Sequence, residues 1–238
     1  MPNGFIGAAI DAYKSGRPII VYDADGREEE CDLLAPAEYC TPSFVRQLRQ
    51  DAGGLVFLAV HAELWKKLGL RLMADILTEE SGCIPLVDAM ARHRLPYDAT
   101  SSFSVSLNHV NTFTGITDVD RSMTIRSFGE LAIACGMASP AAAVEAFGKA
   151  FRTPGHVPLC LATENLLSTR KGHTELACAM SLIAGTSGVS VGCEMMGDNG
   201  LAMSKRDVFE YAKERNLPFL EGAQIIEYWD ALKAGRHL

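Results

Sequence analysis

A crowded acidic stretch is the first candidate for chemistry in this chain. Six carboxylates lie within ten residues, from Asp23 to Asp32, between the apolar segments 18–21 and 33–35. Like charges at this density repel, so Arg27, a bound divalent cation or solvent must compensate them. Mg²⁺ prefers oxygen ligands, often one or two carboxylates with water and substrate oxygens. The stretch alone is equally consistent with a magnesium site and with a solvated acidic loop.

A second segment, Arg170-Lys171-Gly172-His173-Thr174, has the opposite charge. We expect it to stand where a loop becomes a helix, where unpaired N–H groups and a partial positive charge favour phosphate. Gly172 would let a ligand approach the backbone, and His173 could ligate a metal or donate a hydrogen bond. Taken alone, a solvated basic pair beside a structural histidine is the commoner explanation.

Two single residues complete the polar candidates. His156 follows Pro154 and Gly155 ahead of an apolar run, where a core or surface histidine is the usual explanation. Glu194 lies in the otherwise apolar segment 189–196. A carboxylate there must be paired, raised in pKa or placed at a strand end. Glu194 is therefore either a candidate general base or an end-of-strand ion pair.

The hydrophobic pattern predicts the elements that position these residues. Strands and helices alternate, but hairpin-like pieces are too frequent for a purely parallel sheet. We expect a layered α/β or α+β fold, a mixed sheet packed with helices, in one domain over residues 1–238. Segment 62–100 is expected to be a peripheral excursion and 152–156 a loop. The expected strands are 18–22, 33–37, 55–60, 102–107, 157–162, 188–196 and 217–220, and the expected helices are 5–15, 42–51, 120–135, 139–151, 170–184, 204–216 and 223–233.

Composition narrows the class of partner. The 238 residues are 48% hydrophobic and 21% charged, as in ordinary globular proteins. A net charge of −7 argues against nucleic acid or an anionic membrane as the main partner. The seven cysteines form no Cys-x-x-Cys pair and are odd in number, which fits neither a zinc site nor a disulfide framework. A reducing cytoplasm is the expected location, and we expect no signal peptide or membrane helix.

Several motifs in register resemble a known family. Gly26–Asp32, Arg152–Val157, Arg170–Glu175 and Cys193-Glu194 occur in this order, with Ser101–Ser106 and Thr114–Arg121 between them. Together they resemble 3,4-dihydroxy-2-butanone 4-phosphate synthase of riboflavin biosynthesis, from about Gly16 to the end of the chain. The long 62–100 segment is similar to the monofunctional archaeal form.

The resemblance implies a Mg²⁺- or Mn²⁺-dependent lyase, with two ions and no organic cofactor, that converts D-ribulose 5-phosphate to 3,4-dihydroxy-2-butanone 4-phosphate and formate. It also implies a homodimer with active sites at the subunit interface. Glu28 and His173 would be metal ligands, and His156 and Glu194 essential acid/base groups. The substrate contacts would come from Arg27, Glu28, Asp32, Arg170, Lys171, Gly172, His173, Thr174 and Glu194, with Asp23, Glu30 and Thr114 in support.

Three residues depart from the family pattern. Gly26 stands where an Asp is frequent, Cys31 where a small residue is usual, and Phe57 where a Cys is expected near the substrate. The added bulk of Phe57 motivates one alternative, the same metal site acting on another sugar phosphate. A second alternative is a non-catalytic paralogue that binds a sugar phosphate, although such a protein would not need His156 and Glu194 as an acid/base pair.

Overall fold

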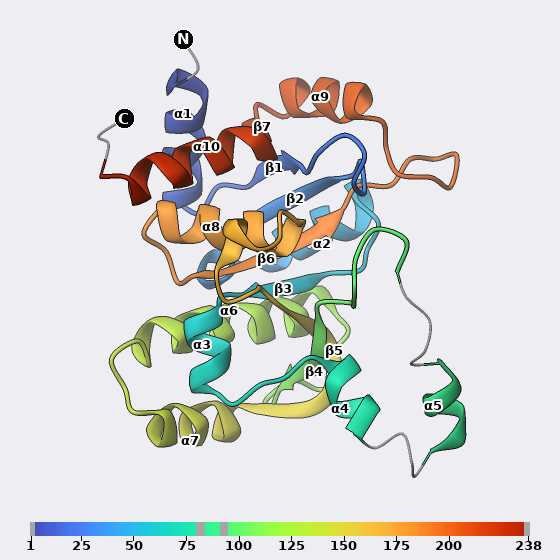
Figure 1. Cartoon of the computed structure of the whole chain (residues 1–238), viewed down its shortest axis with the longest axis vertical. Helices are drawn as coiled ribbons and strands as arrows, with labels where there is room; N and C mark the ends of the chain where they lie inside the picture. Colours follow the sequence, from blue (N-terminus) through green and yellow to red (C-terminus); the bar gives the residue numbers. More distant parts are fainter. Residues whose placement is uncertain (1–2, 80–83, 91–94, 236–238) are drawn as a thin grey trace.

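The strands of the described residues form one mixed sheet. The computed structural model describes residues 3–79, 84–90 and 95–235. The seven-stranded sheet has the order β4-β5-β3-β6-β2-β1-β7 (Figure 1). It pairs β1 with β7 and β3 with β5 in parallel, and its other neighbours antiparallel. The strands are β1 Ile19–Tyr22, β2 Cys31–Pro36, β3 Phe57–Val60, β4 Phe103–His109, β5 Phe151–Leu161, β6 Val189–Glu194 and β7 Phe219–Glu221.

Helices cover both faces of this sheet. Successive strand residues point to opposite faces, and the apolar side chains on each face are buried under helices. Ile19 and Val21 of β1 join the core under α1 (Asn3–Lys14), α8 (His173–Ile183) and α10 (Gly222–Lys233). Ile20 and Tyr22 join the opposite core, with α2 (Pro42–Asp51), α6 (Asp118–Ala134), α7 (Pro140–Ala150) and α9 (Lys205–Glu214). The layered α+β architecture and the mixed sheet are therefore confirmed.

Side-chain caps start the helices where the sequence predicts them. Thr41 accepts a hydrogen bond from the Phe44 N–H and Ser139 from the Ala142 N–H, each with proline at the first helical position. The Ser204 side chain caps α9 by accepting a hydrogen bond from the Asp207 N–H, without a proline. Such caps satisfy N–H groups that otherwise lack partners in the first turn. The expected helix over 170–184 begins later, at His173, after the short 3-10 turn η3 (Leu166–Ser168).

One end of the sheet collects the polar candidates. β1 ends at Tyr22 and β2 begins at Cys31, so the acidic loop connects them there. Antiparallel pairing sets Asp32 opposite Glu194. Asp32 shares the face of Leu34, and Glu194 that of Ser190, whose hydroxyl donates to the α8 carbonyl of Ala177. Both carboxylates therefore lie on the α8 side of the sheet.

The predicted loop at 152–156 is wrong, because these residues belong to β5. The pairing shifts between Leu107↔Val157 and Asn108↔Arg152, so residues 153–156 bulge out of the ladder. Side chains of β4 hold this bulge: the Ser106 hydroxyl accepts from the Gly155 N–H at 3.2 Å. Proline and glycine in the segment suggested a loop, but these cross-strand contacts keep it in the sheet.

The 62–100 segment is peripheral only in part. The helix α3 (Ala62–Lys67) buries Leu64, and the neighbouring Trp65 donates to the Ala162 carbonyl at 2.8 Å. By contrast, α4 (Met73–Glu79) and α5 (Pro85–Met90) bury no residue, and α5 projects from the body of the molecule (Figure 1). No helix of the described ranges is long and apolar enough to cross a membrane.

Candidate active site

Asp23 organises the acidic loop. Its side chain is buried, and its Oδ1 accepts the Glu30 N–H at 3.2 Å. Its Oδ2 accepts hydrogen bonds from the backbone N–H of Glu28 and from the guanidinium Nη1 of Arg27, both at 3.1 Å. Gly26 has φ +76, a conformation in which an Asp would be strained. The buried carboxylate thus bends the loop so that Arg27 and Glu28 project from it.

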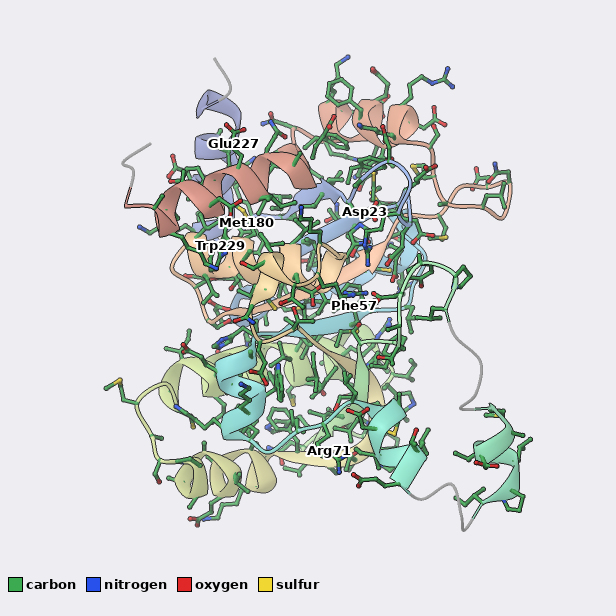
Figure 2. The ribbon with its side chains drawn as sticks, viewed as in Figure 1. Asp23, Phe57, Arg71, Met180, Glu227 and Trp229 are labelled. Carbon is green, nitrogen blue, oxygen red and sulfur yellow. The ribbon has the colours of Figure 1, made fainter. Side chains whose placement is uncertain are left out.

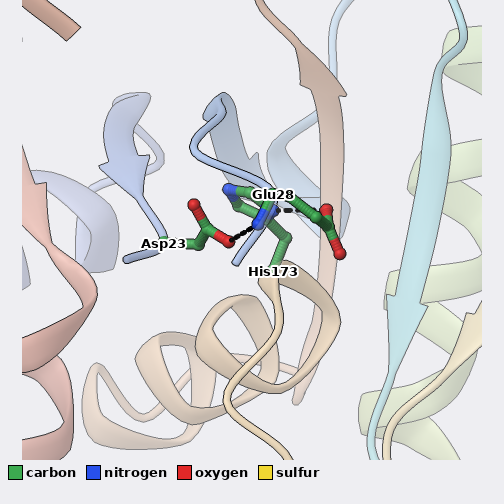
Figure 3. A group of neighbouring side chains, drawn as sticks. All are labelled: Asp23, Glu28 and His173. Carbon is green, nitrogen blue, oxygen red and sulfur yellow. Dashed lines mark hydrogen bonds and ion pairs between the residues drawn. The ribbon is translucent and has the colours of Figure 1, made fainter. Parts of the chain in front are cut away.

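Three side chains that could hold a metal ion meet where the loop approaches α8 (Figure 3). His173, the first residue of α8, has Nδ1 at 3.3 Å from Glu28 Oε2 and Nε2 at 3.7 Å from Asp32 Oδ1. Ligand atoms of Asp23, Glu28 and His173 all lie within 4.8 Å of one another. Carboxylate oxygens and one imidazole nitrogen are suitable ligands for Mg²⁺ or Mn²⁺.

Arg27 pairs with Asp23 and Glu28 of this group, but Asp32 beside it lacks a hydrogen bond within the described residues. Both Asp32 oxygens are buried without a hydrogen-bond partner in the described part of the chain. Burial raises the pKa of Asp32 to about 8, against the charge of His173. Burial opposes protonation of His173, but Asp32 and Glu28 outweigh it and raise its pKa to about 9. Although burial acts the other way, hydrogen bonding to His173 and the charge of Arg27 lower the pKa of Glu28 to about 2. These residues fit a divalent cation, which would satisfy Asp32 and replace the proton on His173.

Glu194 ends β6 beside this cluster. It is half-buried, and its carboxylate makes no hydrogen bond or ion pair with another described side chain. Burial raises its pKa, and the charge of Glu28 acts in the same direction. The end-of-strand ion pair that the sequence left open does not form among the described residues. An unpaired carboxylate with a raised pKa in a polar site is a candidate general base.

The N-terminus of α8 is open to an anion. Gly172 is its N-cap and supplies no side-chain hydrogen bond to the first turn. A Cβ on Gly172 would lie 2.4 Å from Arg170 Nη1 and 2.6 Å from Arg27 Nη2, so glycine lets both guanidinium groups converge here. The buried Thr174 hydroxyl lies 3.3 Å from the Ser102 hydroxyl. Lys171 is exposed and has no hydrogen bond or ion pair within the described ranges.

Arg170 is held by two carboxylates that the sequence did not single out. Its Nη1 donates to the fully buried Glu175 at 2.7 Å, and its Nε donates to Asp98. Asp98 Oδ2 also lies 3.7 Å from Arg27 Nη2, and the Tyr97 ring stacks on Arg27 with 5.9 Å to the ring centroid. The end of the 62–100 segment therefore covers the cationic part of the site. No local pattern marks Asp98, because its partner is 72 residues away.

His156 and Thr114 belong to a second group. His156 lies on the β5 bulge, is exposed, and contacts Asn108 of β4. The Thr114 hydroxyl donates to Asp120 at 3.3 Å, before α6. Within the described residues, no hydrogen bond or ion pair joins either residue to Glu28, His173 or Glu194. One protomer thus brings together the acidic loop, the start of α8 and Glu194, but not His156.

Two of the residues that depart from the family pattern, Phe57 and Cys31, are buried in the core. Phe57 of β3 is 4% exposed and belongs to the core on the α8 side (Figure 2). A Cβ on Gly192, opposite Phe57 in the pairing, would lie 2.9 Å from the Phe57 ring. Cys31 is fully buried, and burial raises the pKa of its thiol to about 12. The bulk of Phe57 is therefore accommodated by a glycine on the neighbouring strand.

Comparison of the chain with known proteins identifies its family. The family model for 3,4-dihydroxy-2-butanone 4-phosphate synthase matches residues 7–228. The chain belongs to this synthase family. It is 44% identical over 220 residues to the 3,4-dihydroxy-2-butanone 4-phosphate synthase of Methanothermobacter thermautotrophicus, covering 92% of this chain and 93% of that protein. The synthase of Archaeoglobus fulgidus is 39% identical, covering 93% of this chain and 92% of that protein. The expected family and its archaeal form are confirmed.

Solved synthase structures share the fold. The Candida albicans 3,4-dihydroxy-2-butanone 4-phosphate synthase aligns with a TM-score of 0.69 at 28% identity, over 94% of this chain and 96% of that chain. Another synthase, solved in complex with two magnesium ions, aligns with a TM-score of 0.72 at 22% identity, over 98% of this chain and 99% of that chain.

Proposed function

We propose that this synthase divides D-ribulose 5-phosphate into 3,4-dihydroxy-2-butanone 4-phosphate and formate at the loop–α8 site. The two products together have the elemental composition of the five-carbon sugar phosphate, so the reaction has no net consumption of water, oxidant or organic cofactor. The observation that carries the proposal is the metal-ligating group Asp23–Glu28–His173 beside the uncapped, arginine-flanked start of α8. A ketose phosphate needs both parts, because its carbonyl and its phosphate lie at opposite ends.

Glu28 and His173 would hold Mg²⁺ or Mn²⁺, with two ions in the complete site and Asp23 holding the loop. The buried, unpartnered oxygens of Asp32 support this assignment. When bound, such a cation supplies Lewis-acid stabilisation of charge on substrate oxygens. Glu30 would support the position of His173, because its backbone carbonyl lies 3.2 Å from His173 Nε2.

The start of α8 would bind the phosphate. Arg170 provides a guanidinium group, the helix provides free N–H groups, and Thr174 provides a hydroxyl. Arg27 lies beside them and would contact the middle of the substrate. Anchoring at this remote end orients the reacting carbons without taking part in the chemistry.

Glu194 would remove the proton that starts enolisation. Its carboxylate has no hydrogen-bond or ion-pair partner among the described side chains, and its raised pKa brings it closer to the working range of a general base. His156 would complete the acid/base apparatus. Because His156 makes no contact with Glu194 in one described protomer, a second copy of the chain is the natural source of this residue.

A homodimer with interfacial active sites is therefore part of the proposal. Large exposed apolar side chains cluster in sequence around Thr114, at Val110, Phe113, Ile116 and Val119. Phe113 is 94% exposed, which is costly for an aromatic ring in water. A second copy that covers this surface would carry His156 toward a neighbouring site.

The test of the reaction is carbon NMR with ¹³C-labelled ribulose 5-phosphate and Mg²⁺. We expect labelled formate from C4, and its loss when a chelator is added. A folded protein that binds the metal but releases no formate would contradict the proposal. Other pentose and hexose phosphates, offered in parallel, test the alternative substrates, and binding without turnover would indicate a non-catalytic paralogue.

We also propose a cytoplasmic location. The six cysteines within the described ranges are free and buried, which suits a reducing compartment. Cys83 lies outside the described residues.

A further inference from the structure

Asn108 of β4 is a buried polar residue whose side chain contacts His156 through both of its polar atoms. It is 4% exposed, and its Oδ1 accepts the backbone N–H of His156 at 2.9 Å. Its Nδ2 lies 3.1 Å from His156 Nδ1, and its Oδ1 lies 3.3 Å from the same ring nitrogen. One amide thus contacts both the backbone and the ring of the exposed histidine.

The chemistry of the amide decides which nitrogen of the ring carries the proton. The backbone N–H of His156 can only donate, so the amide atom facing it is the oxygen, and the other end is the NH₂ group. The NH₂ group can only donate as well, and it is the nearer amide atom to Nδ1. The shorter contact favours Nδ1 as the acceptor over the alternative, in which an Nδ1–H donates to Oδ1 at 3.3 Å, and so favours the single proton of the neutral imidazole on Nε2.

The backbone of Gly115 packs closely against the Asn108 amide. Gly115 has φ +94, and a Cβ at this position would lie 2.1 Å from Asn108 Nδ2. The Gly115 N–H donates to Asp120 Oδ2 at 2.9 Å, which ties this close approach to the start of α6. The bulge that carries His156 is held separately, by Ser106.

We propose that Asn108 is a positioning residue that holds His156 with its proton on Nε2, so that His156 presents a hydrogen-bond donor to the oxyanion developing on the substrate. During enolisation the Nε2–H bond stays intact and His156 transfers no proton, which narrows its proposed acid/base role to that of a hydrogen-bond donor. The exposed nitrogen then has no free lone pair, which leaves proton abstraction to Glu194. This inference rests on the proposed function, because His156 must reach a bound ketose phosphate.

The first experiment reads the tautomer without using activity. Protein labelled with ¹⁵N-histidine is studied by NMR at a pH where the His156 ring is neutral, and His156→Gln identifies the signals. We expect an unprotonated Nδ1 and a protonated Nε2 in the wild type. Asn108→Asp should invert this pattern. A carboxylate can only accept hydrogen bonds, so Nδ1 should carry the proton and donate to it. A wild-type ring with its proton on Nδ1 would overturn the inference.

The second experiment reads the catalytic consequence. Asn108→Asp keeps the acceptor for the His156 backbone N–H, so the bulge should remain folded. We expect kcat to fall by roughly 10²–10³-fold, the usual loss for one oxyanion donor, with KM little changed. Ser106→Ala is the matched control, because it loses a contact to the same bulge without touching the ring, and it should keep both the tautomer and kcat.

A double variant separates positioning from general damage. Asn108→Asp combined with His156→Gln should be no slower than His156→Gln alone, because Asn108 acts through that ring. Additive losses, or an unchanged kcat in Asn108→Asp, would refute the positioning role. If the wild type releases no formate, the proposed reaction fails while the tautomer result still stands. If His156→Gln is fully active, the role of His156 in that reaction fails, and with it the catalytic part of this inference.

Discussion

At the residue scale, His173 links protonation to metal binding. Asp32 and Glu28 raise its pKa to about 9, so the metal-free protein keeps a proton on this ring at neutral pH. A metal needs the neutral ring, so the proton must leave. As the pH is lowered from about 9 to about 8, the apparent Mg²⁺ affinity should fall by about tenfold, and above pH 9 it should level off.

Calorimetric titration with Mg²⁺ in buffers of different ionisation enthalpy measures this proton release. His173→Ala should remove both the pH dependence and Mg²⁺-dependent turnover. Metal-dependent turnover that survives this substitution would exclude His173 as a ligand.

Arg170 and Lys171 are neighbours with different expected roles. Arg170→Ala should weaken binding of phosphorylated substrate, but it also leaves the buried Glu175 without its partner, which typically destabilises a fold by about 3–5 kcal/mol. Arg170→Lys keeps the charge and loses the forked geometry, so KM for ribulose 5-phosphate should rise roughly tenfold. Lys171→Ala should change KM little, because this side chain is exposed and unpaired within the described residues. An equal effect of Arg170→Lys on unphosphorylated ribulose would show that Arg170 is not the phosphate anchor.

At the element scale, the end of the 62–100 segment competes with the substrate. Asp98 pairs with the Nε of Arg170, so we expect a phosphate that binds this side of the guanidinium group to displace the carboxylate. Asp98→Asn should bind inorganic phosphate more tightly, on the order of tenfold, measured as its inhibition constant against ribulose 5-phosphate. Asp75→Asn, an exposed position of α4, serves as the control. Weaker phosphate binding in Asp98→Asn would mean that Asp98 orients Arg170 instead of blocking it.

The packing of α6 on the turn η1 (Ala37–Tyr39) depends on Gly129. A Cβ there would lie 2.5 Å from the Glu38 backbone N, so Gly129→Ala should destabilise the protein by about 1–3 kcal/mol in urea unfolding. A Cβ on Gly148 in α7 would have no such neighbour within 4 Å. Gly148→Ala should therefore stabilise the protein by roughly 0.5–1 kcal/mol through helix propensity. Equal effects of the two substitutions would refute the close packing at Gly129.

At the scale of the whole molecule, shared active sites can be tested by mixing two inactive variants. His156→Gln and Glu194→Gln should each abolish turnover. If each site takes His156 from one subunit and Glu194 from the other, each mixed dimer has one intact site. Because about half of the dimers are mixed after subunit exchange, about a quarter of wild-type activity should return. Sites built within one protomer would stay inactive after mixing, provided that size-exclusion chromatography shows the exchanged protein to be dimeric.

Much of the fold was predictable because its signals are local. Thr41, Ser139 and Ser204 each cap a helix through an N–H three residues later. The alternation of β2 and β6 places Asp32 and Glu194 on defined faces once the strands are recognised. The wrong prediction at 152–156 came from reading Pro154 and Gly155 as loop residues, since the contacts that hold them lie on another strand.

By itself the sequence determined the family, the layered mixed sheet, and the acidic loop and basic helix start as two halves of one site, because short motifs and periodicity carry this information. Tertiary structure alone decided that Asp98 pairs with Arg170 across 72 residues and that Asn108 orients His156 across 48. Among the described residues, no hydrogen bond or ion pair joins His156 to Glu28, His173 or Glu194 within one protomer. These are contacts between distant residues, and no periodicity encodes them, because they depend on which strands become neighbours and in which register.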